Sequence, residues 1–167
     1  LKANIHYSIM FYGGKLLNHL SVQDEELSEF ISLKSLNRNV AIVMDSDVNT
    51  PHNSPNATKK RISEEISKNG FSWITEGYTI ENYITVGVLK IALKKIGITS
   101  RYVSNGDHYR NPLHPQNFDP PLSSNDRINK VTLAKAVIKQ STDSDEWPLD
   151  LLEKITKLAE FICVSNG

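Results

Sequence analysis

The sequence predicts an α/β fold in which a parallel sheet is flanked by helices. Two observations lead to this prediction. Segments rich in β-branched and aromatic residues alternate with segments of helical apolar spacing along much of the chain. In addition, residues 40–44 (VAIVM) form a continuous apolar run, which is typical of a central parallel strand covered on both faces.

The first elements follow from local patterns. Residues 5–14 (IHYSIMFYGG) read as a strand closed by a Gly-Gly turn. Residues 15–36 have helical apolar spacing and form one bent helix or two short ones. After the strand at residues 40–44, residues 57–70 predict a helix that ends at Asn-Gly, with Ile62 and Ile66 on its inner face.

The later elements continue the alternation. Residues 71–75 (FSWIT) predict a third strand, and residues 79–96 predict a helix. Its apolar side comprises Ile80, Ile84, Val88, Ile91 and Leu93. Residues 105–126 contain four prolines and no periodicity, which indicates a long irregular loop.

Two helices end the chain, at about residues 126–139 and 149–164. The second carries one apolar stripe, formed by Leu152, Ile155, Leu158, Ala159 and Ile162. We therefore expect one domain with three parts: an α/β core at residues 1–104, a Pro-rich loop at 105–125, and a C-terminal helical part at 126–167.

The net charge, the cysteine content and the length of the apolar runs limit the classes of protein to which the chain can belong. Lys+Arg and Asp+Glu both number 19, so the 167-residue chain has no net charge. Nucleic-acid binding would therefore depend on local basic patches. The single cysteine, Cys163, cannot form an internal disulfide, and its helical context predicts a buried, small apolar side chain. With no apolar run of membrane-spanning length, we expect a cytoplasmic protein without a membrane partner.

Two aspartates follow the apolar run directly. Ligands bind at the carboxyl ends of parallel strands, and Asp45 and Asp47 stand at such an end. Alternation along an extended chain would point both carboxylates to one side and Ser46 to the other. Two adjacent carboxylates repel unless a cation lies between them, and their hard oxygens suit Mg²⁺ or Mn²⁺. The alternative is that Asp45 caps the next turn and Asp47 is solvated.

Two glutamates follow the next predicted strand. Glu76 comes directly after it, and Glu81 would lie in the first turn of the helix at residues 79–96, where the helix dipole favours an anion. One of these carboxylates could complete the metal site. Equally, Glu81 could simply stabilise the helix N-terminus.

Four segments in order resemble a known family: HYSIMFYGGKLLNHLS, LNRNVAIVMDSD, KKRI and TEGYTIENYI. Together they are similar to the Toprim nuclease region of the overcoming-lysogenization-defect (OLD) family, whose members are ATP-dependent endonucleases of bacteria and phages. The resemblance covers most of residues 5–84 and resumes weakly at NKVTLAKAVI. It implies a Toprim-like parallel sheet with a C-terminal helical extension.

The resemblance also implies site residues and partners. Asp45 and Asp47 match the D-x-D metal ligands of the family, and Glu81 matches the second glutamate of its E-I-E-N-Y segment. Lys130 resembles a lysine that stabilises charge on the scissile phosphate. The implied activity is cleavage of DNA with one or two Mg²⁺ or Mn²⁺ ions, within a longer protein that carries an ATPase domain and can form a homodimer.

The sequence departs from the family pattern at two places. Thr79 replaces the first glutamate of E-I-E-N-Y, and no Glu-Gly strand precedes residue 5. The GGK at residues 13–15 is not a P-loop, because Leu16 stands where Ser or Thr would bind Mg²⁺, so no ATP site is expected in this chain. The chain is expected to be a C-terminal piece of a longer protein.

Other functions stay open at this point. Lys59, Lys60 and Arg61 could contact a DNA backbone, or could form a solvated helix face with the glutamates that follow. An apolar strand followed by D-x-D is also found in aspartate phosphotransferases and nucleotide-sugar glycosyltransferases. A non-catalytic DNA-binding or dimerisation module with an incomplete metal site is the remaining alternative.

Overall fold

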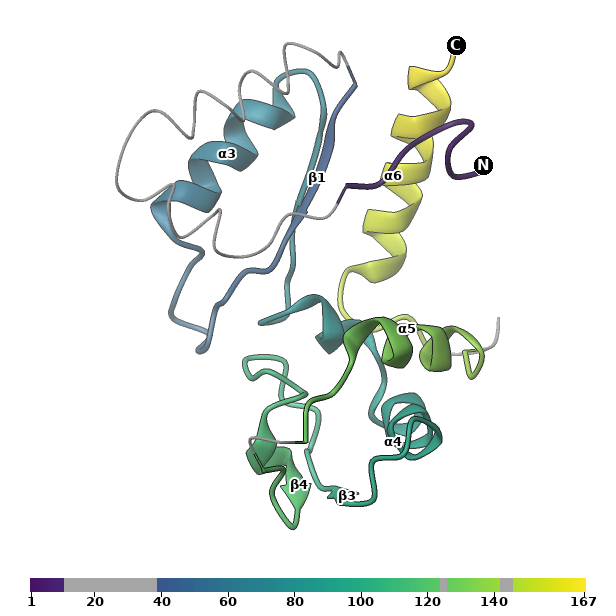
Figure 1. Cartoon of the computed structure of the whole chain (residues 1–167). Helices are drawn as coiled ribbons and strands as arrows, with labels where there is room; N and C mark the ends of the chain where they lie inside the picture. Colours follow the sequence, from purple (N-terminus) through teal and green to yellow (C-terminus); the bar gives the residue numbers. More distant parts are fainter. Residues whose placement is uncertain (11–38, 124–125, 142–145) are drawn as a thin grey trace. The chain divides into compact units, whose positions relative to one another are not determined.

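The computed structural model of the chain describes residues 1–10, 39–123, 126–141 and 146–167 (Figure 1). It has a mixed α/β structure that divides into two compact units. The sheet unit comprises Leu1–Ser46, Ser54–Thr75 and Leu152–Gly167, and the helix-pair unit comprises Asp47–Asn53 and Glu76–Leu151. The division between the two units falls within residues 1–104, which the sequence analysis treats as one core.

The sheet unit contains the predicted parallel pair of strands. Strand β1 (Ala41–Met44) pairs in parallel with β2 (Phe71–Ile74), in a register that runs from Ala41 opposite Phe71 to Met44 opposite Ile74. Helix α3 (Ala57–Ser67) connects the two strands. The Asn56 side chain caps α3 by accepting the backbone N–H of Lys59 at 2.8 Å, as expected of asparagine before a helix.

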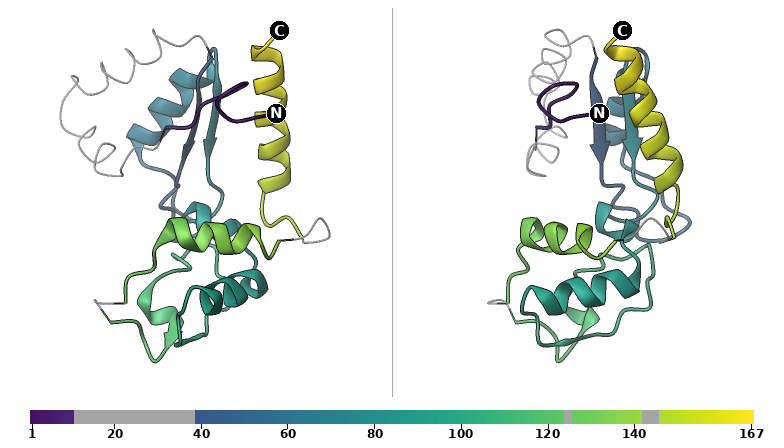
Figure 2. Two further views of the ribbon diagram at one scale, coloured as in Figure 1. Left: turned by 45° about the vertical axis from the view of Figure 1, so that its right-hand side comes forward. Right: turned by 90° about the vertical axis from the view of Figure 1, so that its right-hand side faces the viewer.

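Helix α3 covers one side of this sheet. Ile62 and Ile66 of α3 are each 1% exposed and pack against Met44, so the predicted inner face of this helix is confirmed. Helix α6 (Leu151–Ser165) lies on the other side (Figure 2), where the rings of Phe71 and Phe161 have centroids 6.3 Å apart.

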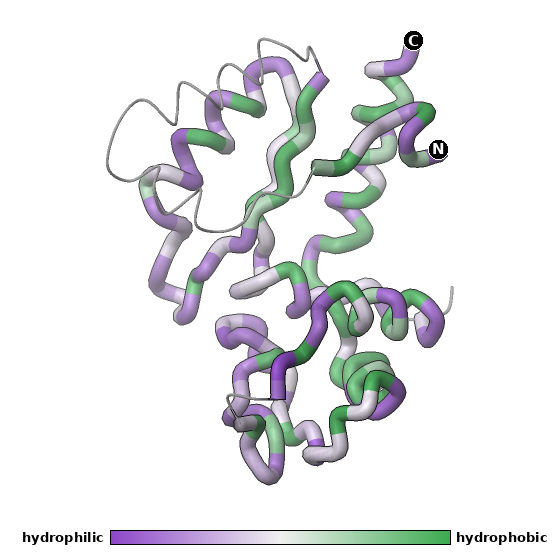
Figure 3. Tube along the Cα trace, viewed as in Figure 1, coloured by the Kyte–Doolittle hydropathy of each residue, from purple (hydrophilic) through white to green (hydrophobic). Residues whose placement is uncertain are grey.

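Two predictions about burial in the sheet unit are wrong. Strand β1 is not covered on both faces, because Val43 is 46% exposed within a sheet of only two strands among the described residues. The apolar stripe of α6 is covered in part: Leu152 and Ile155 are 55% and 40% exposed, while Leu158, Ala159 and Ile162 are half-buried. Cys163 is exposed rather than buried, because it lies outside that stripe. Figure 3 shows that apolar and polar residues alternate along α6.

The helix-pair unit is built around helices α4 (Val86–Lys95) and α5 (Lys130–Ile138). Two short strands, β3 (Arg101–Tyr102) and β4 (Phe118–Asp119), pair antiparallel beside them. Two 3-10 turns complete the unit, η1 (Ile80–Tyr83) and η2 (Pro115–Asn117). Its core consists of Leu89, Ala92, Leu93, Tyr102, Phe118 and Leu133.

The predicted helix at residues 79–96 is divided into η1 and α4. Ile84 is extended, with φ −99° and ψ 121°, and the Thr85 side chain then caps α4 by accepting the Val88 N–H. The predicted apolar side is wrong in part, since Ile80 and Ile91 are 41% and 49% exposed. Leu93, on the predicted side, is buried as expected, and the break brings Leu89 and Ala92 into the core beside it.

The expected irregular loop at residues 105–126 contains η2 and β4. Phe118 of β4 is 2% exposed, and its ring meets Tyr102 edge to face at a centroid distance of 5.3 Å. A position without periodicity in the sequence therefore supplies a core residue.

The predicted strand at residues 5–14 does not form in its described part. Residues 3 and 7 make an isolated bridge around a turn in which Asn4 has φ 61°. Ile5, Ile9 and Met10 are 61% to 70% exposed, because this turn leaves them without strand partners. Residues 11–14 and the predicted helix at residues 15–36 lie outside the described residues. In the described ranges, no helix has both the length and the apolar character needed to cross a bilayer.

Candidate metal centre

The carboxyl ends of β1 and β2 remain linked beyond the paired residues. The Thr75 N–H donates to the Met44 carbonyl at 2.9 Å, and the Ser46 N–H donates to the Thr75 hydroxyl oxygen at 2.8 Å. Ser46 is 3% exposed, whereas Asp45 before it is half-buried and Asp47 after it is exposed. Ser46 is therefore buried between two aspartates that are more exposed.

Helix α3 supports this strand end. Lys59 is 4% exposed, and its ammonium donates to the backbone carbonyl of Asp45 at 2.7 Å. Lys59 is thus held in the fold rather than presented to a nucleic acid. Lys60 and Arg61 are exposed, and the Lys60 ammonium donates to the Ser54 hydroxyl at 2.9 Å, so DNA contact by these two residues stays a prediction.

Asp47 does not follow the extended path that the alternation argument assumes. Its φ of 53° places it in the left-handed region, which aspartate tolerates better than most residues. The Asp47 N–H donates to the Tyr78 carbonyl at 3.0 Å. This bond ties Asp47 to the segment that leads into η1, within the helix-pair unit, whereas Asp45 belongs to the sheet unit.

Glu81 lies in η1 rather than in the first turn of a long helix. The turn is capped by Asn82, whose side-chain oxygen accepts the Thr79 N–H at 2.8 Å. Glu81 stands in the first turn of η1, and its own backbone N–H helps to lower its pKa, but a single 3-10 turn has only a small dipole. Glu81 is nevertheless only 8% exposed, and its charge needs another partner.

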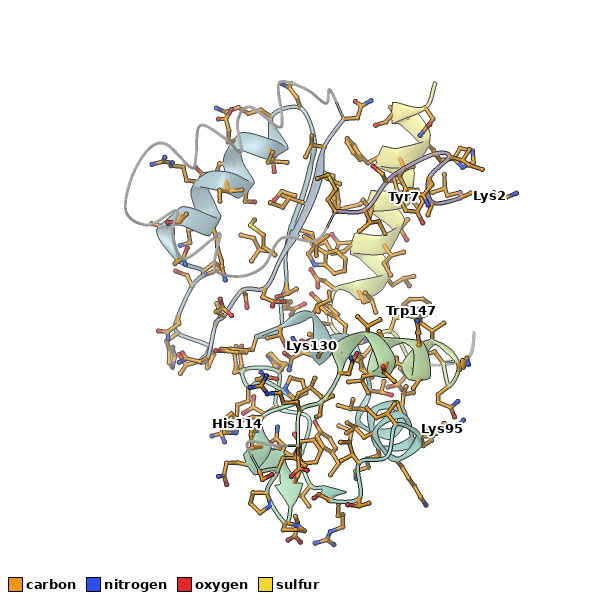
Figure 4. The ribbon with its side chains drawn as sticks, viewed as in Figure 1. Lys2, Tyr7, Lys95, His114, Lys130 and Trp147 are labelled. Atoms are coloured by element: carbon orange, nitrogen blue, oxygen red, sulfur yellow. The ribbon has the colours of Figure 1, made fainter. Side chains whose placement is uncertain are left out.

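Lys130 is that partner. Its Nζ lies 2.6 Å from Oε1 of Glu81, and the lysine side chain is 63% exposed while that of the glutamate is 9% exposed. Lys130 is the first residue of α5, directly after Asn129, whose side chain accepts the Thr132 N–H at 3.0 Å (Figure 4). Two predicted site residues from distant parts of the sequence are thus in direct contact.

The two carboxylate oxygens of Glu81 have different surroundings. Burial raises the pKa of Glu81, but the hydrogen bond and charge of Lys130, together with the Thr79 hydroxyl, outweigh it and hold the pKa below its ordinary value of 4.5. The carboxylate is therefore ionised at neutral pH. Its second oxygen, Oε2, is buried and has no hydrogen-bond partner, which is costly for a charged group.

Hydrogen bonds of the neighbouring residues fix the turn that carries Glu81. The Asn82 amide donates to the Arg110 carbonyl at 3.0 Å, and the Glu76 N–H donates to the Tyr83 hydroxyl oxygen at 2.9 Å. The Tyr83 hydroxyl in turn donates to Asp150. The only sequence signal for these roles is the polar composition of the ENY segment, and polar turns of this kind are common.

A cleft of about 300 Å³ adjoins Lys130 in the helix-pair unit. Its lining combines apolar, amide and charged side chains: Asn111, Leu113, Pro115, Leu122, Asp126, Arg127, Ile128 and Lys130. The Asp126 carboxylate accepts both the hydroxyl and the N–H of Ser123, at 2.7 and 2.9 Å. The cleft therefore offers two basic side chains beside one acidic group that is already hydrogen-bonded.

Within the described ranges, no three His, Cys, Asp or Glu side chains come together as a group that could hold a metal ion. A centre formed by Asp45, Asp47 and Glu81 therefore stays a prediction. Comparison with protein-family models, with curated proteins and with solved structures found no match for this chain.

Proposed function

We propose that the chain is the metal-dependent nuclease part of a DNA endonuclease. In this proposal Asp45, Asp47 and Glu81 bind one or two Mg²⁺ or Mn²⁺ ions, and Lys130 contacts the scissile phosphate. The observation that carries the proposal is the state of Glu81, a buried and ionised carboxylate with one oxygen on Lys130 and the other without a partner. Buried charges that the fold compensates only in part are characteristic of functional sites.

The proposed ligands are all carboxylate oxygens, the atom type that a hard divalent cation prefers. Mg²⁺ and Mn²⁺ prefer carboxylate oxygens and retain water or phosphate as further ligands. Oε2 of Glu81 is such an oxygen and lacks another partner. Asp47 has an exposed carboxylate, and its backbone is bonded to Tyr78, which lies close before Glu81 in sequence. The role of Asp45 rests on the resemblance and on its place at the end of β1.

In the proposed reaction the cation would polarise the phosphate and lower the pKa of a bound water. The residues of the chain have separate tasks. Glu81 would fix the position of the cation, because η1 holds this side chain against α5. Lys130 would offset the negative charge that develops on the phosphate oxygens. DNA is the proposed partner, with the ATPase domain of a longer protein and a second copy of the chain as further partners.

The test is titration with Mn²⁺ by calorimetry, with plasmid nicking measured on the same samples. Asp47→Asn and Glu81→Gln remove a charge with little change in shape, and asparagine tolerates the left-handed backbone at residue 47. Asp119→Asn is the matched control, because Asp119 forms an exposed ion pair with Arg101. We expect saturable binding and nicking that both site variants weaken and the control leaves intact. Binding that is insensitive to both site variants would refute the proposal.

A further inference from the structure

We propose that the turn at residues 107–110 binds unpaired nucleotides of a DNA strand, with the rings of His108 and Tyr109 stacking on bases and the Arg110 guanidinium binding a backbone phosphate. This inference rests on the proposed function for the identity of the nucleic acid. It adds the class of substrate, which is DNA with unpaired bases. The binding needs no metal ion, so it can be measured separately from cleavage.

The backbone of this turn is anchored to the segment that carries Glu81. The Tyr78 N–H donates to the His108 carbonyl at 2.7 Å. The Asn82 amide donates to the Arg110 carbonyl at 3.0 Å, and Asn82 directly follows Glu81 in η1. Both ends of the turn are therefore fixed beside the candidate site, and its side chains are held in place before any ligand binds.

One carboxylate inside the turn orients the arginine. Oδ1 of Asp107 accepts the Tyr109 N–H at 2.9 Å, and Oδ2 of Asp107 lies 3.3 Å from Nε of Arg110. The Arg110 side chain is 79% exposed, so this ion pair contributes little to stability. Because a guanidinium has five donors in a fixed fork, Arg110 can bind phosphate oxygens with its other nitrogens.

The two aromatic rings lie side by side on the turn. The ring centroids of His108 and Tyr109 are 4.1 Å apart, and both side chains are half-buried. Neither residue belongs to the core of the helix-pair unit. Among the described residues, neither side chain has a hydrogen-bond partner. The fold therefore positions these rings without using them for its own packing or hydrogen bonding.

This combination of side chains suits a single strand. Aromatic rings and arginine planes stack on unpaired bases with little regard to sequence, whereas the bases of a duplex are already stacked on one another. A protein partner would be expected to meet an apolar centre. None of the large hydrophobic side chains that are exposed lies within residues 104–117. A DNA strand with unpaired bases is therefore the partner that the turn fits best.

The experiment measures binding by fluorescence anisotropy in EDTA, at constant ionic strength, with a labelled oligothymidylate and a duplex of the same length. We expect the single strand to bind more tightly than the duplex. Tyr109→Ala should weaken single-strand binding about tenfold, the effect of losing one base–aromatic stack, while Tyr109→Phe keeps the ring and should keep the affinity. Tyr7→Ala is the control, because Tyr7 is a half-buried tyrosine of the sheet unit.

The salt dependence tests the phosphate contact. Arg110→Gln should flatten the slope of log affinity against log salt concentration by about 0.7, the value for one phosphate contact on a single strand. Arg101→Gln is the matched control, since Arg101 is 77% exposed and forms an ion pair with Asp119 in the same unit. Equal slopes for the unmodified chain and Arg110→Gln would overturn the role of Arg110.

A further measurement needs no variant. An iodouracil-containing single strand is irradiated with the unmodified chain, so that a base stacked on an aromatic ring becomes cross-linked to it. We expect peptide mass spectrometry to find cross-links at His108 or Tyr109. Cross-links confined to other peptides would overturn the proposal, even if Tyr109→Ala failed to fold.

Failure of this inference and failure of the proposed function give different results. Single-strand binding that is no tighter than duplex binding, or that Tyr109→Ala leaves unchanged, would overturn the inference alone. Metal binding that is insensitive to Asp47→Asn and Glu81→Gln, together with single-strand binding that requires Tyr109, would overturn the proposed function and leave the turn as a DNA-binding surface. Circular dichroism of Tyr109→Ala confirms that folded proteins are being compared.

Discussion

Replacement of Lys130 by methionine tests the physical account of Glu81 directly. Loss of one partner of a buried pair costs about 3–5 kcal/mol, because the other charge is left uncompensated, whereas an exposed pair contributes about 0.2–1 kcal/mol. The pair of Glu81 and Lys130 is intermediate, because the glutamate side chain is 9% exposed and the lysine side chain is 63% exposed. We therefore expect Lys130→Met to lower the free energy of unfolding at pH 7 by about 1–3 kcal/mol, between the two limits.

The stability difference between the unmodified chain and Lys130→Met should depend on pH, in a direction set by the pKa of Glu81. In the unmodified chain the pKa of Glu81 lies below 4.5, so its stabilising effect is present above that value and is lost as the pH falls through the lower, folded-state pKa. Without Lys130 the main remaining effect is burial, which raises the pKa of Glu81, so protonation should then favour the folded state. The stability difference between the two proteins should therefore shrink as the pH falls from 7 to about 4.

Urea unfolding of the helix-pair unit measures this difference. The chain has two tryptophans, one in each unit, so a Trp73→Phe background leaves Trp147 to report on the helix-pair unit alone. Lys130→Met/Glu81→Gln should recover most of the lost stability, because no charge then remains buried. A stability loss of equal size at pH 7 and at pH 4 would refute the reasoning, since it would point to packing of the lysine stem instead of charge.

Four further predictions concern the fold. Asp47→Ala should lower stability by about 1 kcal/mol in urea unfolding, because residue 47 has φ 53°, while Asp47→Asn should cost clearly less; equal effects would contradict the backbone argument. Gly70→Ala should destabilise by about 1–3 kcal/mol, since a Cβ there would lie 2.3 Å from the Val40 carbonyl oxygen. Gly87→Ala in α4 meets nothing within 4 Å and should leave the melting temperature unchanged or raised. Phe118→Ala should cost about 3–5 kcal/mol in thermal unfolding, because Phe118 is 2% exposed; a loss below about 1 kcal/mol would show that β4 does not contribute to the core.

The parallel pair and its connecting helix could be predicted because each has a strong local signal. The apolar run before Asp45 identifies β1, and the spacing of Ile62 and Ile66 identifies the inner face of α3. The helix at residues 79–96 was predicted too long, because apolar periodicity continues across Thr85 and conceals the cap that divides it. Thr85 is a good N-cap residue, but threonines within a helix are common enough that this signal alone does not place a break.

The candidate residues could be named from the sequence, but the positions of their side chains could not. Asp45 and Asp47 stand out from local sequence, yet the left-handed φ of Asp47 has no signature in a D-S-D pattern. Glu81 and Lys130 were connected only through the family resemblance, since no spacing rule relates residues so distant in sequence. Their contact follows from the packing of η1 against α5, which depends on the tertiary structure.

In the proposed function, the two oxygens of Glu81 have different roles. A pair kept for stability alone gains from donors on both oxygens, because each unsatisfied buried atom subtracts from its benefit. Here Oε1 has an ammonium at 2.6 Å, and Oε2 has no donor although polar groups surround the turn. Under the proposed function, Oε2 is the atom that a cation would contact, and the stability of Lys130→Met measures how much of the charge of Glu81 the ammonium compensates.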